Sequence, residues 1–326
     1  MALLRRSLAA GLLLAAAWPA GVMAQAPQPF PDRPITLVVP NAAGGAADGL
    51  ARAVAEQLSR QLAQPVVVEN IGGASGALGA QRVLRAAPDG HTLLFGTTSD
   101  MVVTPIANRG AGYTVRDFSP IAQVGVTPMT LVARAGGPVG NAEQLVALAR
   151  QRPNGLSVGT TGTASLQAFA AVAMQRTAGI DLLGVPYKGG APLLNDLLAG
   201  QLDLGLITLP AALPQVRAGK LTMLGVLSAA RAATAPDLPT LGETPAFKGV
   251  TVEIWAAIAG PKGLPAPVVE RLSQAIRTVL EDREFSERRA RQGDMTVPHR
   301  SPAEFTAFLA AEDSRYRVLA TGLKLE

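Results

Sequence analysis

Four short segments rich in glycine and small polar residues carry the chemistry that the sequence offers. Each follows a run of apolar, β-branched residues and precedes apolar residues with helical spacing; the segments are 41–48, 96–100, 159–165 and 187–190. A helix that starts at such a turn presents unpaired N–H groups and the positive end of its dipole, and glycine lets an anion approach the backbone. The pattern therefore predicts binding of a small anion. The alternative for any one segment is a tight turn or helix cap without a ligand.

The composition argues against several other kinds of chemistry. The 326 residues include no cysteine, which removes thiol catalysis, thiolate zinc sites and disulfide bonds. The two histidines, His91 and His299, have no second ligand-type residue at metal spacing. None of the turns matches a dinucleotide or P-loop motif, and Ala77 stands where a nucleophile elbow over 73–77 needs its final glycine. We expect no metal, no cofactor and no catalytic residue.

The charge pattern argues against nucleic-acid binding. Basic residues are scattered along the chain, and aromatic residues make up only 4% of it. In the one dense cluster, Arg288, Arg289 and Arg291 lie close in sequence to Glu284 and Glu287, which predicts a solvated helix face.

The first 24 residues have the three parts of an export signal. Arg5 and Arg6 precede the apolar stretch 8–17, and a small-residue cleavage site ends at Ala24. This order predicts a periplasmic protein whose mature chain starts at Gln25 and has a net charge of +3 instead of +5, because the leader holds two arginines and no acid. No later segment approaches 18 continuous apolar residues, so we expect the mature protein to be soluble.

Strands and helices alternate along the mature chain, which predicts an α/β fold with a largely parallel sheet. The predicted strands are 35–39, 65–69, 91–95, 129–132, 156–158, 182–185, 203–207, 221–227 and 251–259. The predicted helices are 50–62, 77–86, 141–150, 164–177, 191–199, 211–218, 267–280 and 302–320. Asn141 with Gln144, and Ser301 with Glu304, have capping-box spacing at two helix starts. Gly179 and Gly322 are expected to end two of the helices.

Five motifs, in this order along the chain, resemble one known family. They are Val39-Pro40 through Gly44-Gly45 to Asp48 and Ala51-Arg52, Pro65-Val66-Val67-Val68-Glu69-Asn70, Ala87-Pro88-Asp89-Gly90, Val185-Pro186-Tyr187-Lys188-Gly189 and Ala218-Gly219-Lys220-Leu221. The family is that of the substrate-binding proteins of tripartite tricarboxylate transporters, the Bug family. The resemblance implies a type II periplasmic binding protein with two α/β lobes joined by crossing strands and a carboxylate clamped in the cleft between them. Lobe 1 would hold 25–128 with 229–326, and lobe 2 would hold 129–228.

The resemblance also implies the residues that line the cleft. Lobe 1 would contribute Asn41, Gly44, Gly45, Ala46, Ala47, Asp48, Thr97, Thr98, Ser99 and Asp100. Lobe 2 would contribute Thr161, Gly162, Thr163, Ala164, Ser165, Tyr187, Lys188, Gly189, Ile207 and Thr208. Two alternatives stay open: Lys188 as a surface lysine paired with an acid, and Asp48 as a cap of the first helix. Trp255, on a predicted strand, is expected in the core.

Three residues depart from the family pattern and bear on the ligand. Asn41 replaces an aromatic residue, Asp100 a threonine and Ile207 an aspartate. An ionised Asp100 in the cleft would repel a second carboxylate and disfavour a tricarboxylate such as citrate; the alternative is that Asp100 caps a helix near Met101. Ile207 would favour an apolar ligand body.

These observations lead to one predicted function and two alternatives. We predict an exported, monomeric receptor that captures a small carboxylate and delivers it to membrane transporter subunits. The alternatives are a ligand sensor for a signalling partner and an envelope enzyme on the same fold that uses Lys188 as a base.

Overall fold

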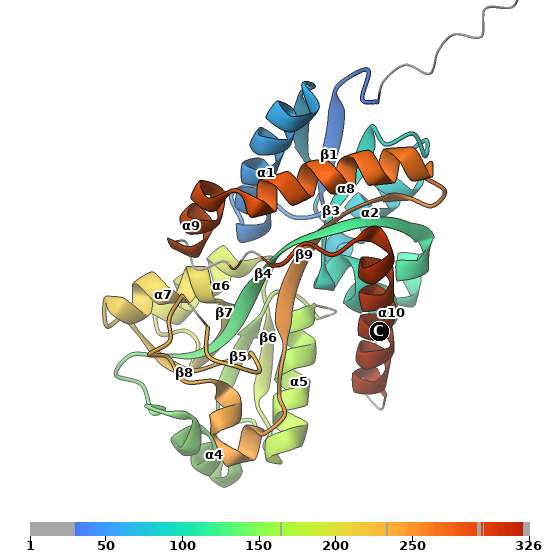
Figure 1. The fold of residues 1–326 in the computed structure, drawn as a ribbon. Helices are drawn as coiled ribbons and strands as arrows, with labels where there is room; N and C mark the ends of the chain where they lie inside the picture. Colours follow the sequence, from blue (N-terminus) through green and yellow to red (C-terminus); the bar gives the residue numbers. More distant parts are fainter. Residues whose placement is uncertain (1–29, 164, 233, 292–294, 296, 322–326) are drawn as a thin grey trace, which may run out of the picture.

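The computed structural model describes residues 30–321 except 164, 233, 292–294 and 296 (Figure 1). The described chain forms two α/β halves, the first and second lobes, along one sheet path with the strand order β2-β1-β3-β9-β4-β7-β5-β6, and β8 pairs with β4. This arrangement confirms the predicted α/β class with two lobes. The sheet is not largely parallel as predicted, because four of the eight strand pairings in the described chain are antiparallel.

The first lobe contains the parallel strands β1 (Ile35–Val39), β2 (Val66–Asn70) and β3 (Thr92–Thr97), with β9 (Glu253–Pro261) antiparallel to β3. Leu37 and Leu93 share a core with α1 and α8, and their neighbours Val38 and Leu94 pack in the other core, because successive strand residues face opposite sides of a sheet. The helices of this lobe are α1 (Ala46–Leu62), α2 (Ala77–Leu84), α3 (Thr104–Ala107), α8 (Ala266–Glu281), α9 (Arg283–Arg291) and α10 (Pro302–Ala320).

The second lobe repeats the pattern of strand, turn and helix. Its strands are β5 (Ser157–Thr160), β6 (Leu183–Pro186), β7 (Leu204–Thr208) and β8 (Leu221–Val226). Its helices are α4 (Ala142–Gln151), α5 (Leu166–Ala178), α6 (Gly190–Leu198) and α7 (Leu209–Arg217).

The strand β4 (Phe118–Arg134) connects the lobes (Figure 1). It pairs with β9 up to Pro128 and with β7 from Met129 onward, so the pairing partner changes at the predicted lobe limit. The sequence predicted only 129–132 of this strand. Pro120 and Pro128 obscure its first part because proline does not donate to a strand ladder, and the register shifts near Pro120 and Gly125 accommodate the irregularity.

The contacts of residues 229–252 favour a second crossing between the lobes that lies closer to β9 than the predicted limit between residues 228 and 229. Ala232 and Ala235 pack with Leu209 and Leu213 of α7, and the carbonyl of Pro239 accepts a hydrogen bond from Val226 of β8. These contacts favour a limit near Val252, just before β9. The exact lobe limits stay a prediction.

Both predicted helix starts have the expected caps. The Asn141 side chain accepts a hydrogen bond from the Gln144 amide, although the Gln144 side chain returns to Gly140 instead of Asn141. Ser301 and Glu304 form the complete reciprocal box. Gly179 ends α5 with a φ of 60°, as predicted, and Gly322 lies outside the described residues.

Three local predictions need correction. The strand β3 continues to Thr97, and Ser99–Val103 forms one π-helical turn, η2, where 96–100 was predicted as a loop. The strand β5 includes Thr160, which was also assigned to a loop. The face of α9 is not wholly solvated, because Arg289 is only 6% exposed.

Candidate functional site

Turns from both lobes meet at the ends of the parallel strands, the usual ligand position in open α/β sheets. We call 41–45, 72–76, 97–100, 160–163 and Ser165 the interlobe loop cluster. A Cβ atom built on Gly72 would lie 3.5 Å from the Ala42 amide nitrogen, and one on Gly76 would lie 2.7 Å from Cβ of Asp100. From the second lobe, a Cβ on Gly162 would lie 3.6 Å from Oγ of Ser75. The first lobe thus supplies three adjoining turns, and the second lobe reaches them through Gly162.

The turn at 73–76 is the part of the cluster that the sequence analysis missed. Gly73, Ala74, Ser75 and Gly76 have φ angles of 127°, 47°, 55° and 92° in succession. Two of these residues are not glycine, so the backbone is strained, and such strain persists where surrounding contacts enforce it, often at functional sites. One such contact is the hydrogen bond of 2.8 Å from the Thr104 hydroxyl to the Ser75 carbonyl. The signal for this turn in the sequence is a pair of glycines around two small residues, a pattern that also partly matches a nucleophile elbow.

Asp48 organises the turn before α1. Its carboxylate accepts hydrogen bonds from the Gly44 amide at 2.8 Å, from Arg52 Nε at 3.1 Å and from Asn70 Nδ2 at 3.0 Å. Burial opposes ionisation of Asp48, but these bonds and the charge of Arg52 hold its pKa below the ordinary value. Asp48 thus binds the turn that leads into α1, and in this arrangement the Gly44 N–H is already paired.

Replacing Asp48 by alanine should lower the free energy of unfolding by about 1.5–3 kcal/mol, the range for a hydrogen bond to a charged group. Asp48→Asn keeps an acceptor for Gly44 and should lose less. Urea unfolding of both variants measures the difference. Because the pKa is depressed in the folded state, the loss should be largest at neutral pH and should shrink as acid protonates the parent carboxylate. Equal stability of Asp48→Ala and the parent at pH 7 would contradict this role.

Asp100, the last residue of 97–100, is a fully buried member of the cluster. One carboxylate oxygen accepts from the Thr97 amide and the other from the Thr97 hydroxyl, both at 2.6 Å, and the Tyr113 hydroxyl donates to the Asp100 carbonyl. Burial raises the pKa of Asp100 to about 7, although the hydrogen bonds from Thr97 oppose the rise. The carboxylate folds back on Thr97 and does not cap a helix near Met101. The Asp100 carboxyl group therefore becomes negatively charged only near neutral pH.

Thr98 is also buried, and it connects the cluster to the crossing strand β9. Its hydroxyl accepts a hydrogen bond of 3.0 Å from the Trp255 amide. Trp255 is 2% exposed, which confirms its predicted place in the core, and its indole N–H donates to Glu312 of α10 at 2.8 Å. Ser99, the next residue, is half-buried.

In the second lobe, Ser165 and Thr160 hold the Gly162 turn. Both hydroxyls donate to the Gly162 carbonyl, at 3.1 and 3.2 Å, and Ser165 also caps α5 by accepting from the Ala168 amide. Gly162 has a φ of 107°. Thr161 is half-buried and Thr163 is exposed, while Ala164 lies outside the described residues.

The remaining predicted residues of the second lobe differ in exposure. The Tyr187 hydroxyl donates to Asp196 at 2.8 Å, Lys188 is exposed, and Gly189 precedes α6. Ile207 is 3% exposed in a core cluster with Val132, Leu197 and Ala212, so its side chain packs inside the lobe and does not provide an apolar cleft wall. Thr208 is half-buried at the start of α7.

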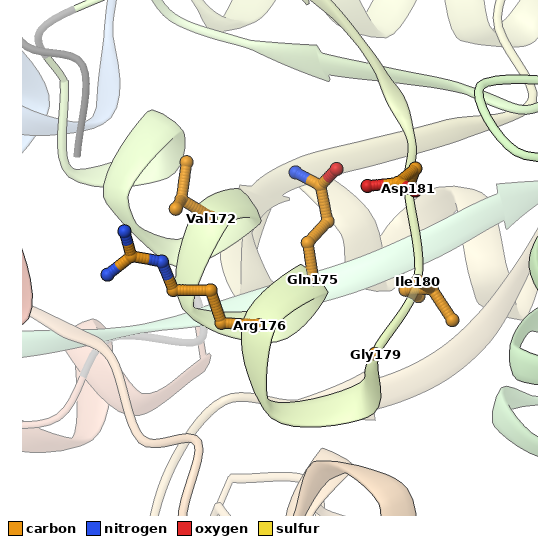
Figure 2. Close-up of a pocket in the computed structure, with 6 residues that line it drawn as sticks. All are labelled: Val172, Gln175, Arg176, Gly179, Ile180 and Asp181. Carbon is orange, nitrogen blue, oxygen red and sulfur yellow. The ribbon is translucent and has the colours of Figure 1, made fainter. Parts of the chain in front are cut away.

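An open hollow of about 500 Å³ lies at the other end of α5 (Figure 2). Val172, Gln175, Arg176, Gly179, Ile180 and Asp181 line it. The Gln175 side chain donates to the Ala171 carbonyl and accepts from the Leu182 amide, so both of its polar ends are already paired. This hollow lies at the opposite end of α5 from the Gly162 turn.

Two kinds of feature are absent from residues 30–321 outside the gaps. Within that part of the chain, no group of three or more His, Asp or Glu side chains is placed to hold a metal ion. The same residues include no helix with the length and apolar character needed to cross a bilayer.

Comparison with known proteins decides the family. The family model for the tripartite tricarboxylate transporter family receptor matches residues 50–324 of this chain. The chain belongs to this family. Its members are solute-binding receptors and not enzymes, which confirms the predicted Bug-family resemblance and the absence of an enzymatic role.

Solved structures of similar proteins share the fold over nearly the whole chain. The periplasmic binding protein BugD has a TM-score of 0.82 and 34% identity, with 91% of this chain and 99% of that chain covered. The protein Rpa4515 of R. palustris, solved with adipate, has a TM-score of 0.84 and 31% identity over 90% and 97% of the two chains. MatC of Rhodopseudomonas palustris, solved with bound malate, has a TM-score of 0.82 and 31% identity over 89% and 99%.

Proposed function

We propose that this receptor works in the periplasm and binds a small carboxylate at the interlobe loop cluster. The observation that carries the proposal is the approach of the Gly162 turn to Ser75, because it brings together strand-end turns from two lobes. These turns precede α2 and α5, whose first N–H groups have no partner within the helix. The carboxylates bound by two similar receptors, adipate and malate, support the ligand class.

The proposed site needs no charged side chain to bind an anion. A helix N-terminus contributes about 0.3–1 kcal/mol toward a carboxylate, and a hydrogen bond to a charged group about 1.5–3 kcal/mol. Four or five such bonds, less the cost of association and closure, correspond to about −8 kcal/mol, a micromolar dissociation constant. This affinity suits a receptor that must release its ligand again.

Native mass spectrometry of the protein purified from periplasm tests the ligand class. We expect a bound mass that, after release, is identified as a small carboxylate. A co-purified solute without a carboxyl group would contradict the proposal.

Three finer points belong to the same proposal. Cleavage after Ala24 is supported by the order of charged, apolar and small residues in the leader, and N-terminal sequencing should find Gln25 first.

We also propose that the receptor is a monomer and passes its ligand to the membrane subunits of a transporter. Loss of uptake of the identified carboxylate on deletion of the receptor, restored by the parent chain, would support delivery, whereas unchanged uptake would contradict it.

A further inference from the structure

The helix α10 of the first lobe contacts α5 of the second lobe. It packs on β4, α3 and α8, and it also lies beside α5 (Figure 1). The ring of Tyr316 meets the ring of Phe169 edge to face, with centroids 6.5 Å apart, and the two residues are 0% and 4% exposed. In addition, Arg176 donates to the Thr321 carbonyl at 3.0 Å.

Tyr316 is held firmly on its own lobe. The Arg315 guanidinium lies 4.6 Å from the centre of the Tyr316 ring and donates to its hydroxyl at 2.9 Å. Arg315 also lies 2.9 Å from Glu312, which accepts from the Trp255 indole. These contacts fix the ring that α5 meets, so motion of α5 is not easily followed by Tyr316.

The helix α5 therefore approaches the first lobe at two places besides the Arg176–Thr321 hydrogen bond. Its N-terminal turn approaches Ser75 through Gly162, and Phe169, in its second turn, packs on Tyr316. A hydrogen-bonded helix moves as one body. Opening of the loop cluster thus requires α5 to move against the first lobe, which disturbs the Phe169–Tyr316 contact.

We propose that the Phe169–Tyr316 contact stabilises the closed arrangement of the lobes and so sets ligand affinity without touching the ligand. The affinity part of this inference rests on the proposed function. The apparent affinity of a two-state receptor scales with the fraction of molecules in the binding-competent state. Loss of one aromatic pair should lower that fraction and weaken binding by about two- to tenfold.

The chain contains no cysteine, so two introduced cysteines can report the distance between the lobes. The exposed positions Gln274 on α8 and Ala147 on α4 suit spin labels. In this labelled protein without ligand, Phe169→Leu should shift the distance distribution toward an open arrangement, because leucine keeps most of the volume but removes the ring contact. Tyr316→Leu, which removes the contact from the other side, should give the same shift.

The matched control is Phe308→Leu on α10. The ring of Phe308 contacts Trp255, Phe305 and Arg300, all in the first lobe. Phe308→Leu should leave both the distance between the spin labels and the affinity for adipate unchanged. Phe169→Leu should bind adipate more weakly, but at saturating adipate its distance between the spin labels should equal that of the parent. Urea unfolding confirms that all variants are folded.

Unchanged ligand-free distances in both folded variants, Phe169→Leu and Tyr316→Leu, would overturn the inference. The distance measurement needs no ligand, so failure of adipate, malate and citrate to bind the parent would count against the proposed ligand class alone.

Discussion

A Gly162→Val variant should lose carboxylate affinity by about a hundredfold or more while the protein stays folded. Gly162 has a φ of 107°, a conformation that a β-branched residue adopts only at a high cost. Its Cβ would lie 3.6 Å from Oγ of Ser75, so the valine methyl groups add bulk where the two lobes meet. Both the shape of the turn and the approach of the lobes are disturbed. Calorimetric titration with the carboxylate found by mass spectrometry measures the loss.

The matched control is Gly179→Val at the other end of α5. Gly179 also has a positive φ, of 60°, and a Cβ there would meet nothing within 4 Å. This variant should lose stability and keep the parent affinity. Parent affinity in folded Gly162→Val would contradict the assignment of this turn to the binding site.

An Asp100→Asn variant should remove a marked pH dependence of stability. The unfolded chain ionises Asp100 near its ordinary pKa of 3.8, whereas burial raises the pKa of the folded carboxyl to about 7. Between these values the unfolded state gives up a proton that the folded state keeps, so parent stability falls as pH rises, by about 1.4 kcal/mol per pH unit. Asparagine still accepts from the Thr97 amide and does not ionise. Unfolding at intervals from pH 4 to pH 8 should show a growing advantage of the variant.

Asp203→Asn is the control, because Asp203 likewise accepts from the amide and the hydroxyl of one residue, Ser157, but is only half-buried. It should keep the pH dependence of the parent, since Asp100 is intact. Parallel pH profiles of Asp100→Asn and the parent would contradict the burial argument.

Asp100 also bears on the choice of ligand. Above pH 7 the Asp100 carboxylate is negatively charged, and its side chain lies against Gly76 of the 73–76 turn. It should then repel multiply charged carboxylates, so these should bind more weakly at pH 8 than at pH 6. Asp100→Thr should remove this difference. Tight citrate binding at pH 8, unchanged by the substitution, would refute the charge argument.

The sequence predicted the parts of the fold that depend on local pattern. Strand β1 begins and ends where its apolar run does, and Ser301 caps α10 as its spacing indicated. The first part of β4 was missed, because its pairing with β9 joins residues more than a hundred positions apart. A period-two pattern interrupted by Pro120 and Pro128 gives no local sign of that pairing.

The candidate site was predictable as a set of turns but not as a geometry. The Gly162 turn was recognised because a glycine-rich turn precedes a helix, yet its neighbour Ser75 lies 87 positions earlier in the chain. Ile207 was assigned to the cleft by resemblance, whereas the side-chain alternation of β7 directs it into the core with Val132. Asp48 was expected as a cap of α1 or a ligand contact, and it instead pairs with Gly44, just before the helix.

A crystal structure of the receptor with the carboxylate identified by mass spectrometry tests the central claim most directly. We predict that the carboxylate lies between the lobes, with its oxygens about 3 Å from backbone or hydroxyl donors of both 73–76 and 161–165. A carboxylate bound elsewhere, such as in the hollow at the end of α5 (Figure 2), with the interlobe loop cluster left without a ligand, would contradict the account.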